Sequence, residues 1–359
     1  MLISRFKHIV GIAATIALLT DCAGGSSTQP PFQQNPSHTG KPSTPSCPCI
    51  YVANEGPGGD SSVTVYSADA TGDAKPIQIV SGSNTGLSAS RDIAVGADGK
   101  MYVANATGGG SPSHGSVTVY AAGATGNVAP TQTISGPNTR LNDPLGIALD
   151  PVNGDVYVES EGCGSPYFYC IEIFASGADG NIAPIGIIRG KKTELSNSTG
   201  VSLDATGNLY VANYAGVGYK DRGTVTVYAA RSVGNVAPMQ SISGSNTGLY
   251  QPETVALGTR GNIYVPNGSG GPSNAGSVTV YDPGANGNAA PIRTVEGTRT
   301  KLDEPIGVAL DGSNNIYATN YESSTVTVYA AGANGHVRPI NKIKGRGTGL
   351  SYPTGVAIR

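Results

Sequence analysis

The chain has 359 residues, with 52 glycines, 24 prolines, no tryptophan and only 13% charged side chains. That composition is typical of an all-β protein with many turns and excludes a mainly helical one. The 22 basic and 24 acidic side chains give a formal net charge of −2. The chain therefore has no basic excess with which to hold the phosphates of a nucleic acid, and we expect no nucleic-acid partner.

Residues 1–22 have the pattern of a targeting segment. Arg5 and Lys7 give a positive start, and an uncharged, mostly apolar run follows from Ile9 to Leu19. Eleven residues are too few to span a bilayer, which needs about twenty, but they suit the core of a signal peptide. We therefore predict that the protein is exported.

The end of this segment reads Leu-Thr-Asp-Cys, with the cysteine at position 22. It resembles a bacterial lipoprotein signal, in which a leucine three residues before a cysteine precedes cleavage and lipidation of that cysteine. The resemblance implies lipidation of Cys22 and anchoring in the cell envelope. Asp21 departs from the family pattern, which usually has a small residue there. The alternative is an ordinary secretory signal with an incidental Cys22, which would give a secreted protein.

Residues 23–46 are rich in Gly, Ser, Thr, Pro and Gln and contain almost no large apolar side chains. Such a segment cannot bury enough surface to offset the entropy of ordering it. We predict a flexible tether between the anchor and a folded part at 47–359.

Four further cysteines follow Cys22. Cys163 and Cys170 are the two ends of a single predicted loop, and export favours a disulfide between them. Cys47 and Cys49 flank one proline, where a direct bridge would be strained, so they pair elsewhere or stay reduced. Zinc binding by the four thiols is a weaker interpretation, because their spacing is not a standard zinc pattern.

The phrase Tyr-Val-Ala-Asn, or a close variant, recurs at intervals of 51 to 55 residues. It begins at Tyr51, Tyr102, Tyr157, Tyr210, Tyr264 and Tyr317. A fixed period of this size indicates a solenoid or a propeller.

The second repeat shows what one unit contains. Its strand-like runs are Met101–Asn105, Ser116–Tyr120, Thr131–Ser135 and Leu145–Leu149, separated by residues typical of turns. Four short strands are the content of one blade of a β-propeller. Six such units predict an all-β fold, a six-bladed propeller of four-stranded antiparallel blades.

The two ends of the repeat region favour a closed ring. The chain finishes with Tyr352–Arg359, which is the last strand of a unit and nothing more, and the region opens at Ile50–Asn54 with the strand that normally follows it. The final strand can therefore complete a blade with the first three. We predict that Val356–Ile358 pairs with Tyr51–Ala53.

Residues 143–158, which contain Pro-Leu-Gly-Ile-Ala-Leu-Asp before Asn-Gly-Asp-Val-Tyr-Val, and residues 303–311 carry a recognisable motif. The motif resembles that of the NHL-repeat propellers, over about residues 50–359. The units here are longer than usual, and Asn stands where many members of that family have Asp. The resemblance implies a six-bladed propeller and leaves its activity open, because the family includes binding modules, lyases and lactonase-like relatives.

One face of the predicted propeller is the better candidate for binding. The loops between the first two runs of each repeat vary in length and content, whereas the loops on the other face are nearly copied from unit to unit. The loops of a binding face must fit a ligand and so differ from one another, whereas loops that only connect strands can all be alike. We name Tyr214, Tyr219 and Tyr321 as candidate ligand contacts. The alternative is that these rings only cover neighbouring loops.

The Pro-x-Gly that opens most inner strands is replaced by Ser90-Arg91-Asp92 and by Pro252-Glu253-Thr254 in two opposite blades. We predict that Arg91, Asp92 and Glu253 line the mouth of the axial channel and contact a ligand. The alternative is an ion pair that closes the channel.

Catalytic residues are not evident. The chain has no Gly-x-Ser-x-Gly motif, and the repeats hold only His114 and His336, in different loops. We therefore name no catalytic residue and no cofactor. The favoured hypothesis is a monomeric, surface-tethered module that binds a polysaccharide, peptide or protein and touches the membrane only through its lipid.

The alternative function is that of a calcium-dependent, lactonase-like hydrolase or lyase at the channel mouth. Glu253, Asp92 and Asn213 offer the oxygen ligands that calcium prefers. The recurrent asparagines, Asn213 among them, are also explained as turn-forming residues.

Overall fold

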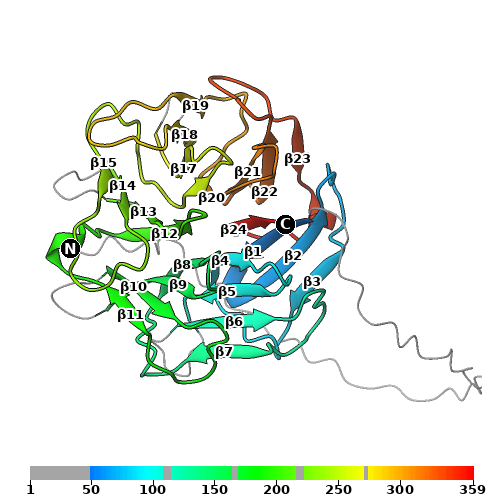
Figure 1. Cartoon of the computed structure of the whole chain (residues 1–359). Coiled ribbons are helices and arrows are strands. Elements are labelled where there is room, and N and C mark those ends of the chain that lie inside the picture. The colour runs from blue at the N-terminus through cyan, green and yellow to red at the C-terminus, as the bar shows by residue number, and fades with distance from the viewer. Residues whose placement is uncertain (1–48, 108–114, 164–168, 216–221, 271–273) are drawn as a thin grey trace, which may run out of the picture. The chain divides into compact units, whose positions relative to one another are not determined.

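The computed structural model describes residues 49–107, 115–163, 169–215, 222–270 and 274–359. They form six four-stranded antiparallel sheets, which Figure 1 shows grouped around a common centre. The six-bladed propeller predicted from the repeats is confirmed. The signal segment, the tether, Cys22 and Tyr219 lie outside the described residues. No helix within the described ranges has the length and apolar character needed to cross a membrane.

The strands of each blade follow one another from the axis outward. Blade 1 is built from β24 (Pro353–Ile358), β1 (Cys49–Asn54), β2 (Ser62–Ser67) and β3 (Gln78–Ser81). Blade 2 is built from β4 (Ser90–Val95), β5 (Met101–Asn105), β6 (Ser116–Tyr120) and β7 (Gln132–Ser135). Blade 3 is built from β8 (Pro144–Leu149), β9 (Val156–Glu161), β10 (Tyr169–Phe174) and β11 (Gly186–Ile188).

The second half of the ring has the same order. Blade 4 is built from β12 (Ser198–Leu203), β13 (Leu209–Asn213), β14 (Thr224–Tyr228) and β15 (Gln240–Ile242). Blade 5 is built from β16 (Ala256–Leu257), β17 (Ile263–Asn267), β18 (Ser277–Tyr281) and β19 (Arg293–Glu296). Blade 6 is built from β20 (Pro305–Leu310), β21 (Ile316–Asn320), β22 (Thr325–Tyr329) and β23 (Asn341–Ile343). Three short 3-10 turns are η1 (Pro57–Gly59), η2 (Lys191–Thr193) and η3 (Arg346–Thr348).

The ring closes as predicted from the sequences of the first and last strands. In blade 1 the C-terminal strand β24 pairs with β1, with Tyr51 opposite Ala357 and Val52 opposite Val356 (Figure 1). Each inner strand also contacts the inner strands of both neighbouring blades, and β24 contacts β4 and β20. Closure therefore leaves no inner strand without a neighbour, which protects the edges of the sheets.

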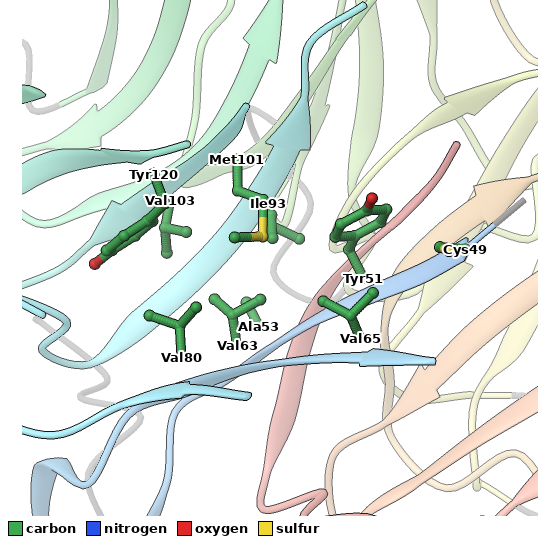
Figure 2. Packing of buried hydrophobic residues seen from close by; sticks show 10 residues of the cluster. All are labelled: Cys49, Tyr51, Ala53, Val63, Val65, Val80, Ile93, Met101, Val103 and Tyr120. Carbon is green, nitrogen blue, oxygen red and sulfur yellow. The ribbon is translucent and has the colours of Figure 1, made fainter. Parts of the chain in front are cut away.

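The core lies between blades and consists mainly of valine, isoleucine and tyrosine from adjacent sheets. Figure 2 shows one such cluster, in which Val63 and Val80 of blade 1 pack with Met101 and Val103 of blade 2. Because both faces of a blade pack against neighbouring blades, the two middle strands of blade 2 are buried along their whole length, and the outer strand is only partly buried. Burial of this kind contributes about 25 cal/mol per Å² of apolar surface.

The nearly identical loops have a structural role. In each of the six junctions a glycine of the loop between the third and fourth strands of one blade forms a parallel bridge with the outer strand of the preceding blade. Gly126 bridges Val80, for example, and Gly72 bridges Ile343 across the point of ring closure. The neighbouring Asn127 also accepts a hydrogen bond from the N–H of Asn84 at 2.7 Å. These loops are uniform because they join one blade to the next.

The recurrent asparagines are also part of the scaffold. Asn213 donates to Thr226 Oγ1 at 3.2 Å and accepts the N–H of Ser196 at 3.1 Å. Asn54, Asn105, Asn267 and Asn320 make the equivalent bonds in their own blades. The carboxamide of Asn213 thus holds a turn, as one interpretation of the sequence predicted.

Candidate functional site

The face on which the inner strands begin carries a ring of unusual backbone positions. In every blade one non-glycine residue just before the inner strand has a positive φ, between 47° and 53°. These residues are Ala89, Asp143, Asn197, Gln251, Glu304 and Tyr352. Each uses its carbonyl to accept an N–H at the end of the second strand, from the residue that follows the strand in five blades and from the last strand residue, Glu161, in blade 3. Left-handed conformations are uncommon outside glycine, and the surrounding turn has to enforce them.

Residues of three blades meet at one part of this ring. Glu55 follows β1, and its Oε2 atom accepts a hydrogen bond from Tyr321 Oη at 2.9 Å. The same Oε2 atom forms an ion pair with Nη1 of Arg91 at 2.9 Å. The ring of Tyr321 lies 5.1 Å, centroid to centroid, from the ring of Tyr352. We call these four residues the mouth network.

The electrostatics of the mouth network follow from its partial burial. Glu55 and Arg91 keep only 15% and 19% of their side chains exposed, so their ion pair is less screened than a surface pair. Burial, followed by the charge of Glu55, raises the pKa of Tyr321 well above its usual range. Tyr321 therefore stays protonated and donates, and its ring and the 38%-exposed ring of Tyr352 offer an aromatic surface beside a charged pair.

Asp92 lies deeper, on the axis. It belongs to the lining of an axial cavity of about 300 Å³, to which the inner segments of all six blades contribute. Its carboxylate accepts the N–H groups of Ile93 at 2.8 Å and of Ile147, in the next blade, at 3.1 Å. Burial raises the pKa of Asp92 to about 7 despite these two bonds.

The other two candidates on inner segments are Arg91 and Glu253, and each has contacts of its own. Arg91 pairs with Glu55 rather than across the channel. Glu253 is only 3% exposed, and its carboxyl lies against Gly268, where an added Cβ would be 3.0 Å from Oε1. Its N–H donates to the carbonyl of Pro266. Tyr214 occupies the same repeat position as Tyr321, and its N–H donates to the carbonyl of Asn197 at 2.9 Å.

Blade 3 departs from the repeat chemistry. Cys163 and Cys170 are joined by a disulfide, with their Cα atoms 6.1 Å apart. Beneath it lies Glu172, where the other five blades have threonine, and its Oε1 atom is 2.8 Å from Sγ of Cys170. Burial raises the pKa of Glu172 to about 8. The two sulfurs and the carboxylate lie within 4.8 Å of one another, but with the disulfide formed the sulfurs are not thiolates and do not offer a metal site.

A second carboxyl is buried in the same blade. Glu159 stands where three other blades have alanine, and its Oε1 atom accepts a hydrogen bond from Ser198 of blade 4 at 2.6 Å. Its Oε2 atom has no hydrogen-bond partner among the residues that the structure describes. Burial in a low-dielectric environment raises the pKa of Glu159 well above its usual range.

Sequence reasoning missed two members of the mouth network, Glu55 and Tyr352. A signal was present, because Glu55 directly follows the first Tyr-Val-Ala-Asn and so holds the same repeat position as Tyr214 and Tyr321. Comparing that position across the repeats would have singled out Glu55 as an acidic side chain where two other repeats have tyrosine. Its partner Arg91 was named from the sequence, but for a different contact.

No protein-family model and no curated protein sequence matches the chain. Solved structures do resemble it. A chain of the nidogen–laminin complex has 15% identity and a TM-score of 0.57, over 87% of this chain and 98% of that one. A Bacteroides caccae protein of unknown function has 11% identity and a TM-score of 0.59, over 87% and 99%.

A candidate 6-phosphogluconolactonase from Bacteroides fragilis is also similar, with 14% identity and a TM-score of 0.53, over 90% of this chain and 100% of that one. Identities this low carry the fold and not the function. The comparisons and the geometry together establish that the chain is a six-bladed β-propeller.

Proposed function

We propose that this protein is an exported, lipid-anchored propeller, related to the NHL-repeat family, that binds a peptide or protein partner at the mouth network. The observation that carries the proposal is the convergence of Glu55, Arg91 and Tyr321 from three different blades beside the exposed ring of Tyr352. Aromatic rings with a charged rim are the usual anchors of protein interfaces.

Two further points support a binding role. The scaffold loops are used to join blades, so the face with the mouth network is the one whose side chains are left to vary. The similar chain from the nidogen–laminin complex belongs to an assembly of proteins, and the same architecture suits a protein-binding module here. A tether of residues 23–46 would let such a module reach a partner near the membrane.

The test is photo-crosslinking in the source cells. A photoreactive amino acid is placed at Tyr352, and at Val152 as a control, because Val152 is 61% exposed and lies in the turn between β8 and β9, at the other end of the inner strand. We expect a discrete, protease-sensitive adduct from position 352 that is lost with Glu55→Gln and absent from position 152. Adducts of equal yield at both positions, or none, would contradict the proposal.

The same experiment separates the other ligand classes. An adduct that resists protease but is removed by glycan hydrolases would replace the peptide partner by a polysaccharide. A calcium ion retained by residues 45–359 in native mass spectrometry and lost with Asp92→Asn would favour the alternative of a calcium-dependent hydrolase or lyase.

The anchor is tested separately. We expect the wild-type chain to partition into the detergent phase and to carry the mass of a lipid on Cys22, and a Cys22→Ser variant to lose both properties. A wild-type protein in the aqueous phase would instead support an ordinary secretory signal.

A further inference from the structure

A second hollow lies on blade 5, away from the axis. Its volume is about 580 Å³, within the range of small-molecule sites. It is formed by β18, β19 and the segment that leads from blade 4 into blade 5. Its lining includes Asn246, Gly248, Tyr250, Thr279, Thr294 and Glu296.

The hollow is open because of one glycine. Gly248 has a φ of 69°, and a Cβ added there would point between Thr279 and Pro291, with its nearest atoms at 3.5 and 3.8 Å. The equivalent positions of blades 3, 4 and 6 hold long side chains with nearly the same φ, between 59° and 64°. Those residues are Arg140, Glu194 and Lys301. A long side chain at position 248 would therefore fill the hollow in a conformation that the fold already accepts.

Two side chains distinguish blade 5 from the other glycine-bearing blades. In blades 1 and 2 the positions equivalent to Tyr250 and Glu296 are all serine. The ring of Tyr250 is held from two sides, because Gly270 leaves room for it and the guanidinium of Arg222 lies 5.4 Å above its centroid. Arg222 is fixed in turn by a 2.6 Å hydrogen bond to the carbonyl of Ser245.

Glu296 supplies the charge of the hollow. It is half-buried, and within the described residues its carboxylate has neither a hydrogen bond nor an ion pair. A carboxylate in such a place is stabilised by a cation that also donates hydrogen bonds. The rest of the lining consists of hydroxyl and amide groups beside one aromatic ring, a set that suits a ligand with several hydroxyls.

We propose that this hollow binds a small polyhydroxylated ligand that carries an ammonium group, of the class of amino sugars. The ammonium pairs with Glu296, one side of the ligand packs along Tyr250, and Asn246 and Thr294 bond to its hydroxyls. This site is separate from the mouth network and does not depend on the function proposed for it.

The test uses D-glucosamine as the probe, with D-glucose as its counterpart without the ammonium group. Binding is followed by saturation-transfer NMR and by titration calorimetry. We expect glucosamine to bind the wild-type protein at least about tenfold more tightly than glucose, as the loss of one charge-assisted bond predicts. Equal binding of the two sugars, or no binding of glucosamine, would refute the proposal.

Variants locate the site. Gly248→Lys should abolish binding by filling the hollow, and Glu296→Gln should weaken it at least about tenfold. Gly86→Lys makes the same change at the equivalent position of blade 2 and should leave binding intact, as should Glu55→Gln in the mouth network. Binding that survives Gly248→Lys in a variant with wild-type thermal stability would place the sugar elsewhere and overturn the assignment.

Discussion

Asp92 and Thr254 hold the same position of the inner segment in opposite blades, and each bonds to the blade that follows. Asp92 Oδ2 accepts the N–H of Ile147 at 3.1 Å, and Thr254 Oγ1 accepts the N–H of Val308 at 3.2 Å. The other four blades have glycine there. The six inner strands therefore do not carry the same side chains. In two opposite blades a polar side chain at this position bonds to the next inner strand, and in the other four blades the position is glycine.

The first prediction concerns those glycines. A Cβ on Gly355 would lie 2.5 Å from Asp92 Oδ1 and 2.6 Å from Asp92 Cα, so backbone would have to move. We expect Gly355→Ala to lower the free energy of unfolding by about 1–3 kcal/mol, as overpacking does. Chemical denaturation measures this, with Gly284→Ala as the control, because a Cβ there has nothing within 4 Å. Equal effects of the two substitutions would contradict crowding at the axis.

The second prediction concerns a repeated tyrosine. Tyr120 is fully buried and its hydroxyl donates to the carbonyl of Thr85 at 2.6 Å, as the equivalent tyrosines do in four other blades. Blade 3 has Phe174 instead, and the corresponding carbonyl belongs to Thr139. We expect Tyr120→Phe to cost about 1–2 kcal/mol, because a buried acceptor loses its donor.

Phe174→Tyr is the matched change in the opposite direction, and it should stabilise the protein by up to about 1 kcal/mol. Thermal and urea unfolding of both variants test the pair. If both substitutions destabilise by the same amount, the hydroxyl does not join the blade to the preceding loop.

The third prediction is a pH dependence from Glu172. Burial raises the pKa of this carboxyl to about 8, against about 4.3 for an unfolded glutamate. Between those values the folded state holds a proton that the unfolded state has lost. The contribution of Glu172 to stability is therefore intact below about pH 4.3 and is lost as the pH rises toward 8.

Glu172→Thr, which restores the residue of the other five blades, should remove this loss. We expect the stability of the variant relative to wild type to rise between pH 5 and pH 8 by on the order of 3 kcal/mol, and then to level off. Urea titrations at several pH values measure the difference, with exposed Glu322→Thr as the control. A difference that does not change with pH would show that Glu172 is ionised in the folded protein.

The fourth prediction concerns the mouth network. The ion pair between Glu55 and Arg91 is partly buried, so we expect a coupling free energy of about 1 kcal/mol, above the median for exposed pairs. A double-mutant cycle with Glu55→Gln and Arg91→Met measures it by urea denaturation. The coupling should fall in 1 M salt only in part, because burial limits screening. Additive single substitutions would show that the pair is not formed in solution.

Much of the fold could be read from the repeats. The runs predicted at Met101–Asn105 and Ser116–Tyr120 coincide with β5 and β6, and the run at Leu145–Leu149 is one residue short of β8. They were readable because each strand is buried by a neighbour that carries the same pattern, so local sequence and tertiary environment agree. The candidate site was harder to predict from the sequence, because only some of its residues lie at positions that recur in every repeat.

The sequence alone determined the number of blades, the strand content of each and the closure of blade 1 by β24, because all three depend on a period that the chain states six times. Only the tertiary structure decided that Arg91 pairs with Glu55, that Asp92 faces Gly355 and Ile147, and that blade 5 is hollow at Gly248. The first two are contacts between neighbouring blades, and the third is a feature of the surface of a single blade. They depend on the rotamer of each side chain and on the space that neighbouring residues leave for it. The period of the repeat specifies neither.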